Sequence, residues 1–215
     1  MDSSTLLYSQ NKESNTLHSR LIISEAVLKK GVSKKDELVD FLREELRETF
    51  DCEVRFWLQG SYKSHTLIKP SDKYSSYDID IGVYLSFETE EADASQVKLA
   101  VKEALESFCK INDECELQQS KNACEGLKYK QLLTIDIPVY AFSGTDIKLA
   151  TDDGWVDSDP KSIQDYLTNA FENPADRANM KRVIRYLKAW INVKWSGTDY
   201  KKYRHWQLIF SLLTI

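Results

Sequence analysis

The sequence predicts a fold of the α+β class, in which a mixed sheet is flanked by helices. Segments whose apolar residues alternate with polar ones, as in half-buried strands, lie between segments with apolar residues every three or four positions, as in amphipathic helices. Apolar residues make up 42% of the 215 residues, and only seven residues are Gly and four Pro. The chain is therefore long and apolar enough to bury one substantial core.

Two helices are expected between residues 12 and 50, before the first strand. Ser33 is expected to cap the second helix, because a Ser side chain accepts hydrogen bonds from the free N–H groups of a first turn. The apolar positions are Leu17, Leu21, Ala26 and Leu28 in the first helix and Leu38, Phe41, Leu42 and Leu46 in the second.

Three strands and a short edge strand are expected next. Residues 52–58 alternate and run into Gln59-Gly60-Ser61, residues 77–85 alternate strictly, and residues 132–142 form a third apolar segment. Residues 146–150 predict the edge strand. The strict alternation indicates one buried face, which carries Ile79, Ile81, Val83 and Leu85.

Three later helices complete the expected elements. Residues 93–111 are amphipathic, Pro160 opens a second helix, and residues 176–195 carry the most convincing apolar stripe. The chain ends in an apolar segment, residues 206–215, with no cap and no polar tail. Such a segment needs a partner to cover it, so we expect it to be the start of a helical domain whose remainder lies beyond this chain.

Composition excludes several classes of protein. The net charge of −5 argues against a protein that coats nucleic acid, and no stretch approaches the roughly 18 consecutive apolar residues of a membrane helix. The first ten residues lack the apolar segment of a signal peptide, so a cytoplasmic protein is expected. The four Cys and three His show no zinc-ligand spacing, and a disulfide scaffold is excluded.

Basic residues gather towards the C-terminus. Residues 177–204 contain nine basic residues and one acidic residue, a balance of +8, which leaves 20 basic and 33 acidic residues elsewhere. One interpretation of this segment is a solvated helix face. The other is that it contacts phosphates while the acidic remainder holds cations.

The triplet Asp78-x-Asp80 stands on the strictly alternating strand. Residues two apart on a strand point to the same face at a spacing of roughly 6.6 Å, and two carboxylates so close resist ionising together unless a cation lies between them. Oxygen ligands of this kind suit Mg²⁺ or Mn²⁺. The alternative is an exposed polar face of an antiparallel strand. A second triplet, Asp157-x-Asp159, precedes Pro160 in an expected turn and is given no role.

Two neighbouring segments favour the metal interpretation. Upstream, Gly60-Ser61 follows a strand and enters an expected helix, where free N–H groups and a hydroxyl can contact an anion. Downstream, Asp136 stands in another strand between Ile135 and Ile137, whose side chains lie on the opposite face. A phosphate-binding turn, an Asp pair and a third strand Asp in this order form a specific constellation.

The motif resembles that of the DNA polymerase β-type nucleotidyltransferases. More narrowly, it resembles the bacterial cGAS/DncV-like nucleotidyltransferases (CD-NTases) of CBASS antiphage systems. The resemblance covers roughly residues 55–195. It is carried by Gln59-Gly60-Ser61-Tyr62, Asp78-Ile79-Asp80, Asp136, Gly154-Trp155 and the helix segment Arg185-Tyr186-Leu187-Lys188-Ala189-Trp190.

The resemblance implies a domain organisation. Residues 1–50 would be N-terminal helices packed on the core, and residues 51–172 a polymerase β-like nucleotidyltransferase palm. Residues 173–215 would be a long helix and the truncated start of a helical domain. Many relatives place a phosphate-contacting Ser at the start of the next helix, where this sequence has Trp206-Gln207.

The resemblance also implies roles for the acidic residues. Asp78, Asp80 and Asp136 would be the catalytic residues and would hold two Mg²⁺ ions, or Mn²⁺ in their place. One ion would bind the triphosphate and the leaving pyrophosphate, and the other would activate a ribose hydroxyl for in-line attack on the α-phosphate. Asp136 would lie nearest the attacking hydroxyl.

Five further residues are implied in nucleotide binding. Gly60 and Ser61 would contact the β- and γ-phosphates, with Gln59 beside them. Lys188, with Arg185, would reach the triphosphate from the long helix. Trp155, Tyr140 and Tyr203 could stack on a base, but aromatic residues in a mixed α/β core are more often packing residues.

The implied function is the joining of nucleoside triphosphates, ATP among them, into a cyclic di- or trinucleotide messenger in antiphage defence. The implied partners are a downstream effector that senses the product and a regulatory protein, with no stable nucleic acid and no membrane. Two alternatives stay open. One is a related transferase that adenylylates a drug, a protein or an RNA end, and the other is a catalytically silent nucleotide-binding protein.

Overall fold

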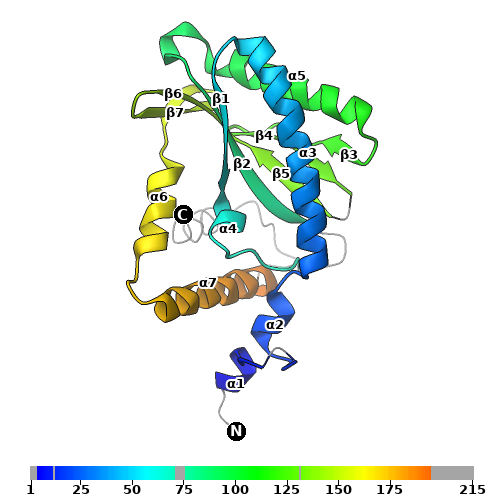
Figure 1. Cartoon of the computed structure of the whole chain (residues 1–215), viewed down its shortest axis with the longest axis vertical. Helices are drawn as coiled ribbons and strands as arrows, with labels where there is room; N and C mark the ends of the chain where they lie inside the picture. The colour runs from blue at the N-terminus through cyan, green and yellow to red at the C-terminus, as the bar shows by residue number, and fades with distance from the viewer. Residues whose placement is uncertain (1–3, 12, 71–75, 131, 195–215) are drawn as a thin grey trace.

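The computed structural model of the chain describes residues 4–11, 13–70, 76–130 and 132–194 and confirms the expected α+β class (Figure 1). Helices flank a mixed sheet, which has eight strands within these residues. In chain order the elements are α1 (Ser4–Leu7), α2 (Leu17–Leu21), α3 (Glu25–Phe50), β1 (Val54–Gln59), α4 (Gly60–Lys63), β2 (Tyr77–Leu85), a 3₁₀ turn (Thr89–Glu91), α5 (Ala94–Ile111), β3 (Cys115–Leu117), β4 (Glu125–Tyr129), β5 (Leu133–Ile137), β6 (Val139–Ser143), β7 (Asp146–Thr151), β8 (Gly154–Asp157), α6 (Pro160–Asn169) and α7 (Pro174–Lys194).

Strand β2 is the centre of the sheet. On one side its residues Asp80–Leu85 pair antiparallel with the whole of β1. On the other side it pairs in parallel with two strands, β5 beside its first half and β6 beside its second half. The remaining strands extend the sheet in the order β3-β4-β5-β2-β6-β7-β8. Strand β2 therefore carries Asp78 and Asp80 and pairs directly with β5, which carries Asp136.

The expected strand over residues 132–142 is two strands, divided at Pro138. Proline has no N–H to donate to a neighbouring strand, which interrupts the ladder at this point. Its carbonyl oxygen still accepts a hydrogen bond from the backbone N–H of Val83, at 2.9 Å, so β5 and β6 stay beside β2. The strand expected over residues 146–150 is confirmed as β7, but its expected edge position is wrong, because β7 pairs with β6 on one side and β8 on the other. The short strands β3, β4 and β8 were not expected because none shows a long alternation.

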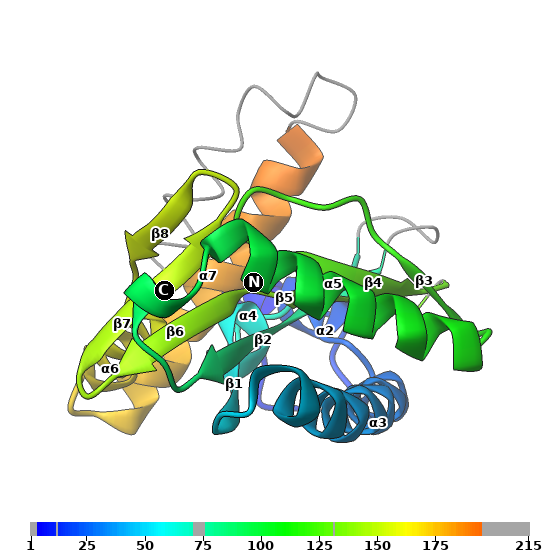
Figure 2. The same ribbon diagram turned by 90° about the horizontal axis from the view of Figure 1, so that it is seen from above.

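The apolar face of β2 forms the core. Ile79, Ile81, Val83 and Leu85 are almost fully buried, as expected, and they share one cluster with the buried side chains of α3 and α5. These two helices run side by side (Figure 2), and the rings of Phe41 and Phe108 pack between them at 5.2 Å between centroids. The opposite face of β2 carries the acidic residues.

The expected helix break at Ser33 is wrong. Helix α3 is continuous over 26 residues, and its N-cap is Ser24, whose hydroxyl accepts from the backbone N–H of Val27 at 3.4 Å. The helix includes Gly31, where the side chain of Tyr77 packs against the backbone. A Cβ there would collide with the hydroxyl of Tyr77, which donates to the carbonyl oxygen of Val27 at 3.1 Å.

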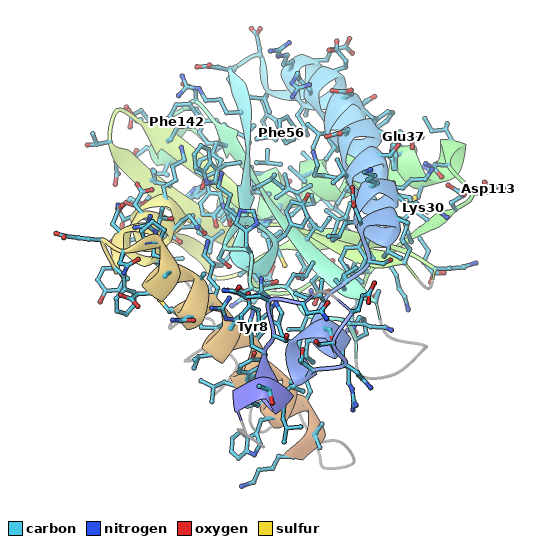
Figure 3. The ribbon with its side chains drawn as sticks, turned by 60° about the horizontal axis from the view of Figure 1, so that its bottom comes forward. Tyr8, Lys30, Glu37, Phe56, Asp113 and Phe142 are labelled. Carbon is cyan, nitrogen blue, oxygen red and sulfur yellow. The ribbon has the colours of Figure 1, made fainter. Side chains whose placement is uncertain are left out.

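Helix α7 crosses below α4 in Figure 1 and contacts the N-terminal elements. Tyr186 on α7 donates its hydroxyl to the carbonyl oxygen of Leu7, at 3.0 Å. The guanidinium of Arg182 lies 3.9 Å from the ring centroid of Tyr8, which is labelled beside the helix in Figure 3. These contacts hold Leu7 and Tyr8 against the long helix.

The remaining expectations concern the later helices and the C-terminal segment. The helices expected over residues 93–111 and from Pro160 are confirmed as α5 and α6, with Asp93 and Asp159 as N-caps. Residues 206–215, like Tyr203, lie outside the described residues. None of the described helices is long and apolar enough to cross a membrane.

Candidate active site

Three carboxylates come together on the polar face of the central strands. Asp78 and Asp80 stand two residues apart on β2, so their side chains share one face of the sheet. Asp136 on β5 is the direct register partner of Asp80 across the parallel pairing, which places its side chain on that same face. We call Asp78, Asp80 and Asp136 the acid cluster.

The Gly60-Ser61 turn lies directly against this cluster. Gly60 begins α4 with a φ of +61°, in the left-handed region that favours glycine. A Cβ on Gly60 would lie only 2.8 Å from Cγ of Asp80, so no other residue fits here without moving that carboxylate. The turn is closed by a hydrogen bond of 2.9 Å from the N–H of Thr66 to the carbonyl oxygen of Ser61.

Side chains from β5 and from the segment after β3 contact the carboxylates. The hydroxyl of Thr134 donates to Oδ1 of Asp78. Gln118 donates its Nε2 to Oδ1 of Asp136 at 3.2 Å, and Lys121 forms an ion pair with Oδ2 of Asp136 at 2.5 Å. Each oxygen of Asp136 therefore has a donor from the same short segment.

The surroundings of the cluster disfavour full ionisation. Removal from water, together with the charges of Asp136 and Asp78, raises the pKa of Asp80 to about 7. Removal from water also raises the pKa of Asp78, with a further contribution from the charge of Asp136. A cation that approaches these oxygens would therefore stabilise their ionised form.

Two basic residues on α7 lie close to the cluster, across the loop that follows α4. Lys188 donates its Nζ to Oγ1 of Thr66 at 3.3 Å. Its burial lowers the pKa of the ammonium group to about 8, against the opposing charges of Asp80 and Asp78. Arg185, one turn earlier, donates to the carbonyl oxygen of His65. Lys188 therefore interacts electrostatically with the acid cluster, whereas Arg185 contacts the loop that follows α4.

The side chain of Gln59 is buried beneath the site and does not reach its surface. Only 8% of the residue is exposed, and its Nε2 donates to the hydroxyl of Tyr84 at 2.9 Å while its Oε1 accepts from the hydroxyl of Tyr140 at 3.2 Å. The rings of the two tyrosines are stacked at 4.6 Å. Tyr140 is therefore a packing residue, and so is Trp155, whose Nε1 donates to the carbonyl oxygen of Ala92.

The donor chemistry of the acid cluster fits a divalent cation, since it offers six carboxylate oxygens on one face of the sheet. As the side chains stand, no three His, Cys, Asp or Glu residues of the described ranges form a group that could hold a metal ion. Lys121 and Gln118 contact the oxygens of Asp136, and Thr134 contacts Asp78. A metal ion would have to replace at least some of these donors.

Sequence reasoning missed Gln118, Lys121 and Thr134. Thr134 could have been found, because it stands two residues before Asp136 on the same strand face. Gln118 and Lys121 have no such signal, since they belong to a segment whose strands show no alternation. Their position depends on the pairing of β3 with β4, which brings the end of β3 to Gly126, the register partner of Asp136.

Comparisons with known proteins identify relatives of this chain. Residues 54–140 match the family model described as the nucleotidyltransferase domain of cyclic GMP-AMP synthase DncV-like proteins. A cyclic GMP-AMP synthase of Escherichia albertii is 60% identical over 204 residues, which are 94% of this chain and 46% of that relative. A cyclic GMP-AMP synthase of Vibrio cholerae is 26% identical over 190 residues, 66% of this chain and 43% of the relative. The chain thus spans about half the length of these curated relatives.

Solved structures show the same fold. Vibrio cholerae DncV in complex with GTP and 5MTHFGLU2 aligns with a TM-score of 0.77 at 18% identity, over 90% of this chain and 69% of that one. Vibrio cholerae DncV with the linear intermediate 5′ pppA(3′,5′)pG aligns with a TM-score of 0.73 at 18% identity, over 85% and 66% of the two chains. The 3′-deoxy GTP bound form of Escherichia coli DncV gives 0.73 at 23% identity, over 89% and 68%.

Proposed function

Because this chain belongs to the DncV-like nucleotidyltransferases of the polymerase β type, we propose that its acid cluster joins two nucleoside triphosphates into a cyclic dinucleotide. ATP and GTP are the proposed substrates. Support comes from the relatives named cyclic GMP-AMP synthase and from a DncV mutant whose structure contains ATP and GTP. Production of the messenger in antiphage defence, an effector that senses it and a regulatory protein partner belong to the same proposal.

In this proposal Asp78, Asp80 and Asp136 hold two Mg²⁺ ions, for which Mn²⁺ can substitute. When bound, such ions neutralise the oxygens of the triphosphate and lower the pKa of the attacking hydroxyl. The raised pKa of Asp80 and Asp78 supports this assignment, because carboxylates that ionise reluctantly on their own are those that a divalent cation stabilises most.

Asp136 accepts the proton of the ribose hydroxyl in the proposed reaction. The hydroxyl oxygen forms a bond to the α-phosphorus of the second nucleotide, and the bond from that phosphorus to pyrophosphate breaks. The product is a linear dinucleotide with a 5′-triphosphate. A second step of the same kind, with the remaining hydroxyl and triphosphate, closes the ring and releases a second pyrophosphate.

The remaining site residues bind and orient the nucleotide. Gly60 and Ser61 contact the β- and γ-phosphates through backbone N–H groups and the Ser61 hydroxyl. Lys188 and Arg185 supply positive charge from α7. Gln59 supports the turn from below through its hydrogen bonds to the two tyrosines. The palm that carries these groups comprises residues 51–172, between N-terminal helices (1–50) and the start of a helical domain (173–215).

The observation that carries the proposal is the register of β2 with β5. It sets Asp80 beside Asp136, with Asp78 on the same face and Gly60 in contact with Asp80. A polar strand face that is merely solvated has no reason to lie beside a third carboxylate from a distant segment. The arrangement therefore favours metal-assisted phosphoryl transfer over a merely solvated strand.

The test is incubation of the protein with ATP, GTP and Mg²⁺ and without any other acceptor. We expect pyrophosphate release and a dinucleotide that resists phosphatase, which removes only terminal phosphates. The double variant Asp78→Asn/Asp80→Asn should lose both. The matched control is Asp157→Asn, which changes an exposed acid of the second Asp-x-Asp triplet and should keep full activity.

Three results would contradict the proposal. Turnover in the double variant would exclude a reaction that depends on the acid cluster. Transfer that occurs only when a drug, protein or RNA is added would indicate an acceptor-modifying transferase. Nucleotide binding without any turnover would indicate a catalytically silent protein.

A further inference from the structure

The segment between β3 and β4 is built to contact Asp136. The backbone N–H of Gln118 donates to the carbonyl oxygen of Gly126 at 2.9 Å, and its side chain donates to the carbonyl oxygen of Leu127 at 3.0 Å as well as to Asp136. Three residues later, Lys121 takes the other oxygen of the same carboxylate. Asp136 is thereby held from both sides by one hairpin.

The backbone of Lys121 is fixed while its side chain is accessible. Lys98, which is almost fully buried on α5, donates its Nζ to the carbonyl oxygens of Lys121 at 2.9 Å and Asn122 at 2.8 Å. The side chain of Lys121 is 42% exposed, whereas that of Asp136 is 20% exposed. The ammonium group can therefore leave Asp136 for water by rotations about its own side chain, without any change in the hairpin.

We propose that Lys121 is a built-in counter-ion, which neutralises Asp136 in the metal-free protein and is displaced when a divalent cation binds. The positive charge of the ammonium group on Oδ2 repels a metal ion that approaches the same carboxylate, so the ion pair competes with metal binding. Lys121 thereby sets the metal concentration at which the acid cluster loads. The inference rests on the proposed function only in taking Asp136 as a metal ligand.

The first test measures metal binding and not activity. EDTA-treated protein is titrated with Mn²⁺ alone, and free Mn²⁺ is followed by electron paramagnetic resonance. Lys121→Met should bind Mn²⁺ about tenfold more tightly than the original chain, because one charged hydrogen bond no longer competes. Lys121→Arg should restore the weaker affinity. Lys148→Met, a change on β7, two strands away from β2 in the sheet, removes an ion pair with Asp157 and should leave the affinity unchanged.

A second readout separates the counter-ion role from general loss of structure. In EDTA, Lys121→Met should melt at a lower temperature than the original chain, because Asp136 loses its partner ion. Saturating Mn²⁺ should remove this difference, since metal replaces the lysine. A difference that persists unchanged in saturating Mn²⁺ would show a merely structural role and overturn the inference.

The outcomes distinguish this inference from the proposed function. Unchanged or weaker Mn²⁺ binding by Lys121→Met would overturn the counter-ion role while leaving the proposed function intact, provided that Asp136→Asn abolishes binding. Unchanged Mn²⁺ binding by Asp136→Asn would instead remove Asp136 from the metal site, and both proposals would fall together.

Discussion

The carboxylate of Asp80 lies in contact with the backbone of Gly60. A Cβ added at Gly60 would lie 2.8 Å from Cγ of Asp80 and closer still to one of its oxygens, and the residue also has a φ of +61°. The phosphate-binding turn and the acid cluster are therefore a single unit. A substitution that displaces the turn will also displace the carboxylate of Asp80.

Gly60→Ala should abolish nucleotidyl transfer while the chain still folds. The added methyl group displaces the carboxylate of Asp80, and the left-handed backbone costs about 1 kcal/mol for a residue with a side chain. Pyrophosphate release with ATP and GTP measures the loss, and circular dichroism checks the fold.

Gly144→Ala is the matched control for that variant. Gly144 has a φ of +59°, but a Cβ there would have no atom within 4 Å among the described residues. It should lose about the same stability and keep its activity. If both variants keep equal activity, the contact between Gly60 and Asp80 has no catalytic importance.

Gln59→Leu should destabilise the protein by about 2 kcal/mol. The substitution removes the hydrogen bonds to two buried tyrosine hydroxyls, and a buried polar group left without its partner costs about 1–3 kcal/mol. Urea unfolding measures the change. Tyr140→Phe, which removes only one of the two bonds and leaves no unpaired hydroxyl on that ring, should cost less; an equal or larger cost would contradict the assignment.

Lys188→Met should weaken triphosphate binding by about tenfold or more. A hydrogen bond from a charged group is worth about 1.5–3 kcal/mol, and Lys188 is the ammonium group of α7 that interacts with Asp80 and Asp78. Binding of a non-hydrolysable ATP analogue with Mg²⁺ gives the readout. Lys194→Met, on the exposed end of the same helix, should bind as the original chain does. Equal weakening in both variants would indicate only the loss of overall positive charge.

The pH dependence of stability should change when His65 is replaced. Burial lowers the pKa of His65, and the charges of Lys181, Arg185 and Lys63 lower it further. The unfolded chain therefore takes up the proton more readily than the folded chain. The stability associated with neutral His65 is present above the unfolded pKa of about 6.5 and is lost as the pH falls from that value through the lower folded pKa.

His65→Asn should reduce this loss between pH 8 and pH 5.5. Asparagine tolerates the left-handed backbone that His65 adopts, with a φ of 56°, and it carries no titrating group. The free energy of unfolding is measured at both pH values for the two proteins. Because both retain His18, whose pKa burial also lowers, its contribution cancels. Identical losses in the two proteins would exclude His65 as the cause.

Local patterns in the sequence determined the central elements of this protein. The strict alternation of residues 77–85 fixed which side of β2 is buried, and hence that Asp78 and Asp80 share the polar face. The apolar spacing of residues 93–111 likewise determined α5. Such predictions succeed because they depend only on the repeat of a strand or helix.

Tertiary structure alone decided the partners of those residues. That Asp136 stands opposite Asp80 depends on the parallel pairing of β5 with β2, and that Lys121 reaches Asp136 depends on a hairpin with no sequence repeat. That Gly31 on α3 packs against Tyr77 depends on how the helix lies on the sheet. Each is a contact between segments far apart in the chain, and its free energy comes from groups that no local window contains. The sequence thus specified which side chains share the polar face of β2, whereas the fold specified which of them meet side chains from other segments.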